Sequence, residues 1–460
     1  MAGSEAAAAR THSGVMGRAR VLEPNLRRRY PVAERAAGVW LWGVDGERYL
    51  DAMSGGSMAA TLGYGRTDLV EAGRAQLARI AHVHNERLTN PAQERLAAEL
   101  LARAPSGFAR VRFVSGGAEA NEQVVQLARA YHVERGALSR WQVISQAQAY
   151  HGPTMETLAL TGRPGLWGPF GPYLPHHRHI PPSTWRFDPS GQGALDALDR
   201  AIEELGAETV SLVFLEPVSA ASLPGVSPPL AFWEGLAERR ERYGFLVGFD
   251  EVVTGMGRTG SWFAAQTVGF VPDLIATAKG LGAGYAPIGA VLVGERVVEA
   301  LWAGSRRFTL GHTWDGAPFA CAVGIAVVEA LEREELIPRV RVAGAQLREE
   351  LAKALSNIPM VHGVAGEGFL CGVHFVDPRD GISLLPRELR VAARVDDAAL
   401  RHRLVTLSTQ PSADGFAGDQ TLVAPAFVAS DAELEEIVRR LRAAVLDVWR
   451  EVEAELEERR

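Results

Sequence analysis

Between about residues 65 and 325, short apolar runs rich in β-branched and aromatic residues alternate with stretches whose apolar residues recur every three or four positions. This alternation is typical of a mostly parallel sheet, because parallel strands need long crossovers, usually helices. The predicted strands are 111–115, 141–145, 211–217, 245–251, 273–279 and 289–294, and the predicted helices are 120–136, 194–206 and 230–244. We therefore predict an α/β fold with a doubly wound sheet.

The two ends of the chain differ from this central block. Residues 17–64 contain the hairpin-like run GVWLWGVDGERYLD, and residues 326–460 contain several helices, the strand GEGFLCGVHFV and a long final helix. We predict a flexible tail at 1–16, a large domain at 65–325, and a small α+β domain built from 17–64 and 326–460.

Composition excludes several classes of protein. A net charge of -7 argues against nucleic-acid binding, which usually requires a basic surface. The two cysteines, Cys321 and Cys371, match neither a disulfide framework nor a zinc motif. No secretory signal and no run of about 18 apolar residues is found. We expect a cytoplasmic protein with no metal, membrane or nucleic-acid partner.

Polar residues stand where the predicted strands end, which is where ligands bind in open α/β sheets. The first strand runs into Ser115-Gly116-Gly117 and then a helix, and the bare N–H groups of such a turn can bind a phosphate. Asp250 ends the fourth strand and offers a carboxylate to a cation. Taken alone, the glycines are more often an ordinary strand-to-helix turn, and a strand-end acid is as often merely solvated.

Lysine is scarce, since the 48 basic residues include only Lys279 and Lys353. Lys353 lies in an amphipathic, surface-type helical pattern. Lys279 ends the strand DLIATAK, and burial there lowers a lysine's pKa, which suits Schiff-base chemistry. An anion-binding turn, a carboxylate and a reactive amine match the phosphate, protonatable ring and aldehyde of pyridoxal 5′-phosphate.

These motifs resemble the class III (subgroup II) pyridoxal-phosphate aminotransferases of fold type I. The resemblance rests on SGGAEANE, AYHG, EPV, GHTWDGAPFACAVG and the block from FLVGFDEVVTGMGRTGSWF to PDLIATAKGLGAGYAPIGAV. It implies an omega-aminotransferase of the amine:pyruvate type, which moves an amino group from an amine or an ω- or β-amino acid to an oxo acid by a ping-pong mechanism. An aminomutase or a decarboxylase of the same fold stays an alternative.

The resemblance also implies roles for individual residues. Lys279 corresponds to the Schiff-base lysine, Asp250 to the partner of the pyridine nitrogen, and Glu216 to the strand-end acid near the cofactor. The other cofactor contacts that it implies are Ser115, Gly116, Gly117, Tyr150, His151, Val252 and Thr313. Thr313 matches a threonine that reaches the phosphate from the other subunit, so a homodimer with shared active sites is expected.

The chain departs from the family pattern at three places. Gly117 stands where the family usually has a hydroxyl residue, and Ser57 stands near the place of an aromatic, which suggests a roomier substrate pocket. The C-terminal run ADGFAGDQ has Phe416 and no arginine, so the group that binds a substrate carboxylate is open. Arg163 and Arg403 are possible substitutes, although each also fits a surface position.

Two other motifs point elsewhere. Gly255, Gly257 and Gly260 match the G-x-G-x-x-G dinucleotide fingerprint, which would fit a nicotinamide-dependent oxidoreductase, but neither a convincing helix nor a ribose-binding acid follows. The run His176-His177-Arg178-His179 lacks metal-binding spacing and is predicted to form a loop.

Overall fold

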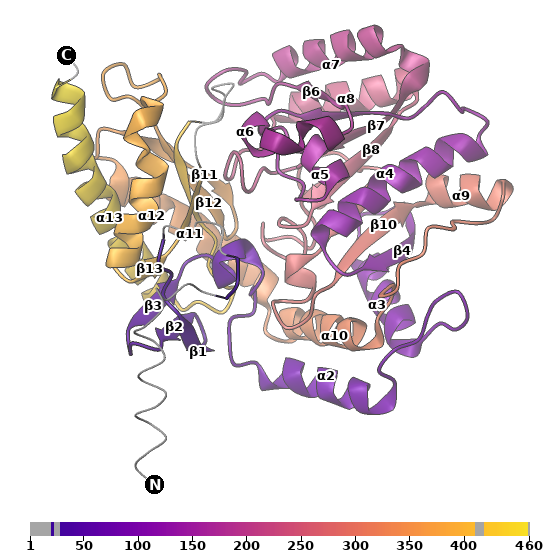
Figure 1. Ribbon diagram of the computed structural model, residues 1–460, viewed down its shortest axis with the longest axis horizontal. Coiled ribbons are helices and arrows are strands. Elements are labelled where there is room, and N and C mark those ends of the chain that lie inside the picture. The colour runs from indigo at the N-terminus through magenta and orange to yellow at the C-terminus, as the bar shows by residue number, and fades with distance from the viewer. Residues whose placement is uncertain (1–19, 23–27, 410–417, 459–460) are drawn as a thin grey trace.

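The computed structural model describes residues 20–22, 28–409 and 418–458, and Figure 1 shows two bodies joined side by side. The larger one is built on a seven-stranded sheet. Its strands, in spatial order, are β4 (Phe108–Val114), β10 (Gly289–Gly294), β9 (Leu274–Thr277), β8 (Leu246–Glu251), β7 (Val210–Leu215), β5 (Gln142–Gln146) and β6 (Arg178–Ile180). Only β10 runs against its neighbours, so the other six strands end at one edge.

Helices cover both faces of this sheet, as the alternating pattern predicts. One face packs on α4 (Gly117–Glu134) and α9 (Glu295–Ala303), and the other packs on α7 (Gln192–Leu205) and α8 (Leu230–Tyr243). β7, β8, β9 and β10 are buried along their whole length, which explains why they are continuous apolar runs. The fold is therefore the expected doubly wound α/β arrangement.

The smaller body joins the two ends of the chain. One sheet consists of β1 (Ala33–Ala37), β2 (Trp40–Gly43), β3 (Arg48–Asp51) and β13 (Leu404–Val405). The other consists of β11 (Val361–Glu367), β12 (Leu370–Phe375), β15 (Gln420–Val423) and β14 (Leu407–Thr409). β3 and β13 pair in parallel, so an N-terminal strand and a C-terminal strand share one sheet, as expected.

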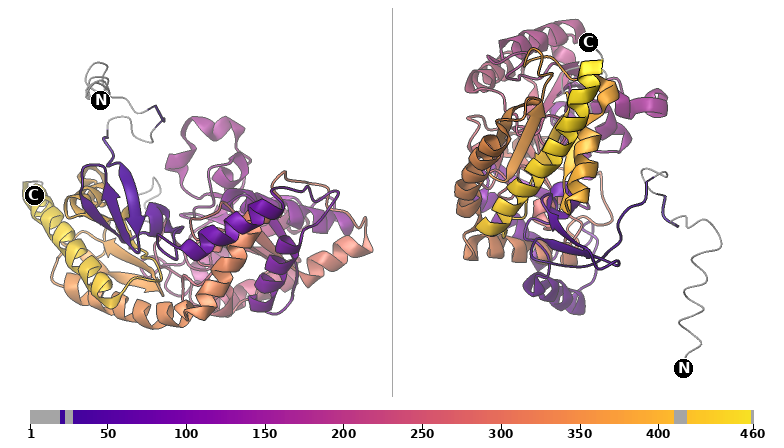
Figure 2. Two further views of the ribbon diagram at one scale, coloured as in Figure 1. Left: turned by 90° about the horizontal axis from the view of Figure 1, so that it is seen from below. Right: turned by 90° about the vertical axis from the view of Figure 1, so that its left-hand side faces the viewer.

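Helices complete both bodies. α11 (Leu336–Leu355), α12 (Val391–Arg401) and α13 (Asp431–Glu458) belong to the smaller body, and Figure 2 shows α13 running along its outer side. α2 (Thr67–Arg79), α3 (Pro91–Arg103) and α10 (Pro318–Arg333) pack together beside the larger sheet, and the short α5 (Met155–Leu160) and α6 (Pro164–Trp167) follow β5.

Several predicted boundaries need adjustment. The predicted limit at 325/326 falls inside α10, and the division into domains stays a prediction. The stretch 176–179, predicted as a loop, enters the edge strand β6 at Arg178. The tail at 1–16 lies outside the described residues. In the part of the chain that is described, no helix is long and apolar enough to cross a bilayer.

Candidate active site

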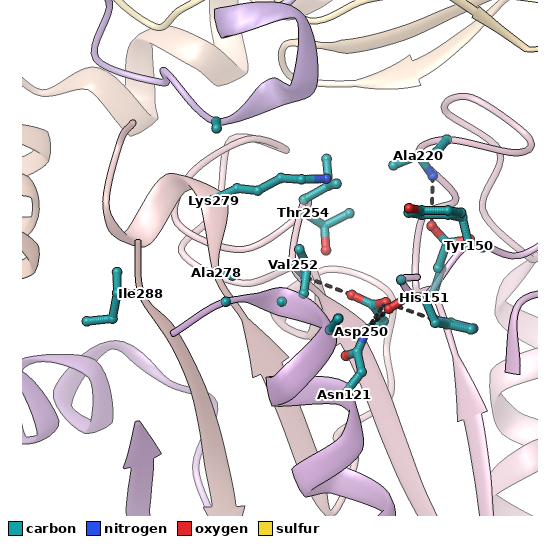
Figure 3. Close-up of a pocket in the computed structure, with 18 of the residues that line it drawn as sticks. Asn121, Tyr150, His151, Ala220, Asp250, Val252, Thr254, Ala278, Lys279 and Ile288 are labelled. Carbon is teal, nitrogen blue, oxygen red and sulfur yellow. Dashed lines mark hydrogen bonds and ion pairs between the residues drawn. The ribbon is translucent and has the colours of Figure 1, made fainter. Parts of the chain in front are cut away.

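A cavity of about 510 Å³ lies at the edge where the six strands end. Segments that follow β4, β5, β7, β8 and β9 line it, and Figure 3 shows their side chains converging. The predicted residues that line it are Ser115, Gly116, Gly117, Tyr150, His151, Glu216, Asp250, Val252 and Lys279. The parallel topology therefore brings together groups that are far apart in the sequence.

Lys279 lies two residues beyond β9, at the start of a 3-10 turn over Lys279–Leu281. Its φ of 33° is in the left-handed region, which costs a residue other than glycine about 1–2 kcal/mol. Burial lowers the pKa of the amine, and the carboxylates of Asp250 and Glu216 oppose that shift. No described residue forms a hydrogen bond or ion pair with this amine, which points into the cavity (Figure 3).

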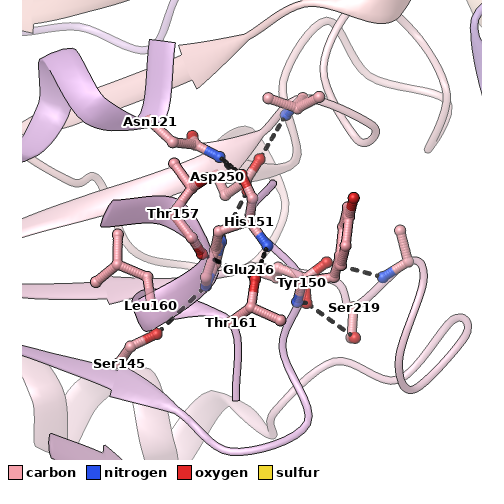
Figure 4. Close-up of polar contacts among 12 residues, drawn as sticks. Asn121, Ser145, Tyr150, His151, Thr157, Leu160, Thr161, Glu216, Ser219 and Asp250 are labelled. Carbon is pink, nitrogen blue, oxygen red and sulfur yellow. Dashed lines mark hydrogen bonds and ion pairs between the residues drawn. The ribbon is translucent and has the colours of Figure 1, made fainter. Parts of the chain in front are cut away.

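Asp250 receives three hydrogen bonds. Its Oδ2 accepts from Asn121 Nδ2 at 2.7 Å and lies 2.8 Å from His151 Nδ1, while its Oδ1 accepts from the backbone N–H of Val252 at 2.9 Å. Three donors fix the orientation of the carboxylate, as Figure 4 shows for the two side-chain donors. Among the described residues, Val252 supplies the single donor to Oδ1, which keeps an acceptor position for a cationic N–H in the cavity.

His151 connects Asp250 to a second layer of polar groups. Its backbone N–H donates to Thr161 Oγ1 at 2.9 Å, and its Nε2 lies 3.3 Å from Ser145 Oγ (Figure 4). Because the carboxylate can only accept, we assign the proton to Nδ1, so that Nε2 accepts from the Ser145 hydroxyl. The ring of His151 packs on Phe214 with its centroid 4.7 Å away.

Sequence reasoning missed Asn121 and Ser145, although both lie near motifs that it used. Asn121 stands in the first turns of α4, directly after the glycine turn, and its amide also donates to the carbonyl of His151 at 2.8 Å. Only the fold shows that this turn faces the end of β8.

The two glycines of the turn at the end of β4 differ in the space around them. Gly116 has extended backbone, and a Cβ added there would meet no atom within 4 Å. A Cβ on Gly117 would lie 2.7 Å from Cγ1 of Val252, which is too close for an unshifted contact. A side chain at position 117 would therefore require Val252, whose β-branched side chain is stiff, to shift.

Glu216 and Tyr150 line the same cavity and contact each other. Glu216 Oε2 accepts from Tyr150 N at 3.4 Å and from Ser219 Oγ at 3.2 Å, and Oε1 accepts from Ala220 N at 3.2 Å. Burial raises the pKa of Glu216 to about 7 and also raises the pKa of the Tyr150 phenol. Two carboxyl groups in one cavity thus have different surroundings.

The residues predicted for the substrate pocket do not line this cavity. Ser57 is exposed and does not line the cavity, which Ala59 lines instead, so its place in a substrate pocket stays a prediction. Arg163 is half-buried just outside the lining, where burial lowers its pKa and Tyr150 and Glu216 oppose the shift. Phe416 lies outside the described residues.

Two further predicted residues lie away from the cavity. Thr313 is exposed and does not line the cavity of its own chain, so its contact with a phosphate in a second subunit stays a prediction. Arg403 pairs with Glu47 at 2.8 Å, which fits the surface position that the sequence also allowed.

The structure gives ordinary structural roles to the other motifs. The segment with Gly255, Gly257 and Gly260 forms turns, and no helix long enough for a dinucleotide fingerprint follows it. A Cβ on Gly257 or Gly260 would collide with α11, which shows close packing rather than a nucleotide cradle. His177 pairs with Glu156 at 2.8 Å, and no metal-binding cluster is found in the described parts of the chain.

Comparison with known proteins agrees with this geometry. The family model described as aminotransferase class-III matches residues 23–445. The chain belongs to the class III aminotransferases. It is an enzyme of that family, with small-molecule amino donors and acceptors as substrates.

Three relatives show how far this aminotransferase matches known proteins. The taurine–pyruvate aminotransferase of Rhodobacter capsulatus is 32% identical, over 89% of this chain and 90% of the relative. A thermostable (S)-enantioselective omega-transaminase from Thermomicrobium roseum has a TM-score of 0.86 at 33% identity, covering 97% and 99% of the two chains. An amine transaminase from an uncultivated Pseudomonas species, solved in its pyridoxal-phosphate-bound form, has a TM-score of 0.86 at 28% identity, covering 94% and 99%.

Class III aminotransferases use pyridoxal 5′-phosphate, and the cavity of this aminotransferase fits that group. The unpaired amine of Lys279 suits its aldehyde, and the open acceptor position on Asp250 suits a protonated ring nitrogen. The space beside Gly116 leaves room for a phosphate at the start of α4, where backbone N–H groups favour anions.

Proposed function

We propose that this aminotransferase moves an amino group from an amine, or from an ω- or β-amino acid, to an oxo acid such as pyruvate in two half-reactions. The observation that carries the proposal is the meeting of Lys279, Asp250 and the Ser115–Gly117 turn in one cavity. Each belongs to a different strand end, and each matches a different group of the cofactor.

The residues of the chain divide the work between them. When bound, pyridoxal phosphate supplies an electron-accepting ring that stabilises negative charge on the substrate carbon. Lys279 would hold the aldehyde carbon and later carry a proton at Nζ, a role that a lowered pKa favours. Asp250 would keep the ring nitrogen protonated, because His151, Asn121 and Val252 hold its carboxylate in place. Tyr150 and Val252 would flank the ring.

A substrate panel tests the reaction. Pyruvate and 2-oxoglutarate would each be offered with simple amines, diamines, β-alanine and taurine, and transfer would be followed by formation of the new amino acid. We expect transfer to pyruvate from amines or ω-amino acids, with the parallel initial-rate lines of a ping-pong mechanism. An aminomutase or decarboxylase would instead convert the donor without an acceptor, and that result would contradict the proposal.

Lys279→Ala tests the assignment of the amine. The variant should lose turnover and the long-wavelength absorbance of the covalently held cofactor. Lys353→Ala is the matched control, because Lys353 lies on α11 and does not line the cavity. This variant should retain both properties. Normal turnover by Lys279→Ala would overturn the role.

We further propose a cytoplasmic homodimer in which Thr313 of each copy reaches the phosphate of the other. The exposure of Thr313 and its absence from its own cavity support this arrangement, and the free thiols Cys321 and Cys371 fit a reducing compartment. Mixing the Lys279→Ala and Thr313→Ala chains tests it. If Thr313 acts across the interface, mixed dimers will contain one site without either lesion and will regain activity.

A further inference from the structure

One donor of the glycine turn is already engaged by an acid of its own helix. Glu119, in the first turn of α4, accepts the backbone N–H of Ser115 through Oε2 at 2.8 Å. The carboxylate therefore stands beside the turn where a phosphate is expected, so the direction in which it points affects how strongly it repels a dianion there.

His312 donates a hydrogen bond to this acid. Its Nε2 lies 3.1 Å from Glu119 Oε1, and its Nδ1 accepts the backbone N–H of Trp314 at 3.1 Å. Because Nδ1 accepts, the proton of the neutral ring is on Nε2, which then donates to Glu119. Each carboxylate oxygen of Glu119 thus has its own donor: His312 donates to Oε1, and Ser115 donates to Oε2.

The segment that carries His312 is fixed to the strand before the glycine turn. Arg112, on β4, donates to the carbonyl of Leu310 at 2.6 Å and pairs with the buried Asp315 at 2.7 Å. The neighbouring Thr313 and Trp314 stay exposed. The loop 310–315 is therefore held at both ends against β4, and His312 reaches from it to α4.

We propose that His312 is a positioning residue for the phosphate end of the active site: it holds Glu119 by a hydrogen bond, and Glu119 in turn orients the Ser115–Gly117 turn. His312 does not line the cavity, so it acts through Glu119 alone. The same loop carries Thr313, so His312 links the predicted subunit contact to the turn of its own chain. This inference rests on the proposed cofactor site.

The test compares two amide substitutions at one position. In His312→Asn, Oδ1 can replace the acceptor for Trp314, but the donor to Glu119 is lost. In His312→Gln, Nε2 can replace that donor. Apoprotein would be titrated with pyridoxal 5′-phosphate, and binding followed by cofactor absorbance and quenching of tryptophan fluorescence. We expect His312→Asn to bind about three- to tenfold more weakly, the range of one typical hydrogen bond, and His312→Gln to bind as the native chain does.

Two controls separate positioning from a general structural role. Pyridoxal, which has no phosphate, should bind equally to all these chains. Glu119→Gln removes the negative charge and should bind the cofactor at least as well as the native chain, and adding His312→Asn to it should have no further effect. The proposal would be overturned if His312→Asn weakened the binding of pyridoxal as much as that of pyridoxal phosphate. It would also be overturned if His312→Asn had its full effect in the Glu119→Gln chain. A native chain that does not bind pyridoxal phosphate would instead contradict the proposed function.

Discussion

The two ends of the cavity are built in opposite ways. At the end around Asp250, side chains from three separate segments supply the hydrogen bonds, and each donor has an identified acceptor. At the end around Gly116, the turn offers backbone groups and open space, and its neighbouring acid is restrained from a loop near residue 312. The first end is rigid before any ligand binds, whereas the second depends on groups outside the cavity.

The difference follows from the chemistry of the two ligand groups. A ring nitrogen needs one directed partner whose charge persists, and a carboxylate held by three donors provides it without rearrangement. A phosphate has several oxygens and accepts N–H groups from many directions, so backbone and a helix N-terminus are sufficient. Substitutions at the Asp250 end should therefore affect chemistry, and those at the Gly116 end should affect binding and packing.

The largest effect is expected for Asp250→Asn. The ring nitrogen loses its charged partner, and kcat should fall about 10²- to 10³-fold, the cost of removing one preorganised electrostatic contact. Glu251→Gln is the matched control, because Glu251 is the next residue of β8 but bonds to Ala264 N, Ala265 N and Thr254 instead of lining the cavity. It should change thermal stability and leave kcat nearly unaltered. Equal kcat losses in both variants would contradict the comparison.

Glu216→Gln should alter the pH dependence of stability. The pKa of Glu216 is about 7 in the folded chain, whereas the ordinary value for a glutamate is 4.5. The folded state therefore keeps this proton up to a higher pH than the unfolded state does. The free energy of unfolding should consequently fall between about pH 4.5 and 7, and stay lower above that range. Urea unfolding measures the difference in free energy of unfolding between the variant and the native chain. From pH 4.5 to pH 8 this difference should shift by about 1–3 kcal/mol in favour of the variant. A difference that does not vary with pH would refute this assignment.

Gly117→Ser examines the steric explanation of the glycine turn. The new Cβ collides with Val252, so the free energy of unfolding should decrease by about 1–3 kcal/mol. In a Val252→Ala background the same substitution should cost almost nothing, because the colliding methyl groups are absent. Urea unfolding of the four chains measures this coupling. If the cost persists without the valine side chain, the collision is not its cause.

Ser145→Ala should have the smallest effect. His151 Nε2 loses its donor while its bond to Asp250 remains, so the expected loss of stability is about 0.5–1.5 kcal/mol. The decrease in kcat should be far smaller than for Asp250→Asn. A comparable decrease would show that the second layer, rather than Asp250 itself, controls the chemistry at this end.

Several residues of the cavity could be predicted from the positions at which the apolar strands end in the sequence. Asp250 was predicted from the end of its strand and Glu216 from the family resemblance, and both line the cavity. Lys279 was predicted to end a strand, whereas β9 stops at Thr277 and the lysine begins a turn. The substrate side stays a prediction, because Ser57 and Arg163 do not line the cavity and belong to segments whose direction no periodic pattern encodes.

The sequence alone determined the layered α/β fold, the union of the two chain ends and the few residues able to carry the chemistry. These follow from local patterns, since burial along a strand and a polar group at its end are both visible in consecutive residues. Only the tertiary structure decided the pairings of His151 and Asn121 with Asp250, of Glu119 with His312, and the close approach of Val252 to Gly117. All four contacts join residues that are between 99 and 193 positions apart in the chain, and hydrogen bonds and steric exclusion act over distances in space that sequence separation does not encode.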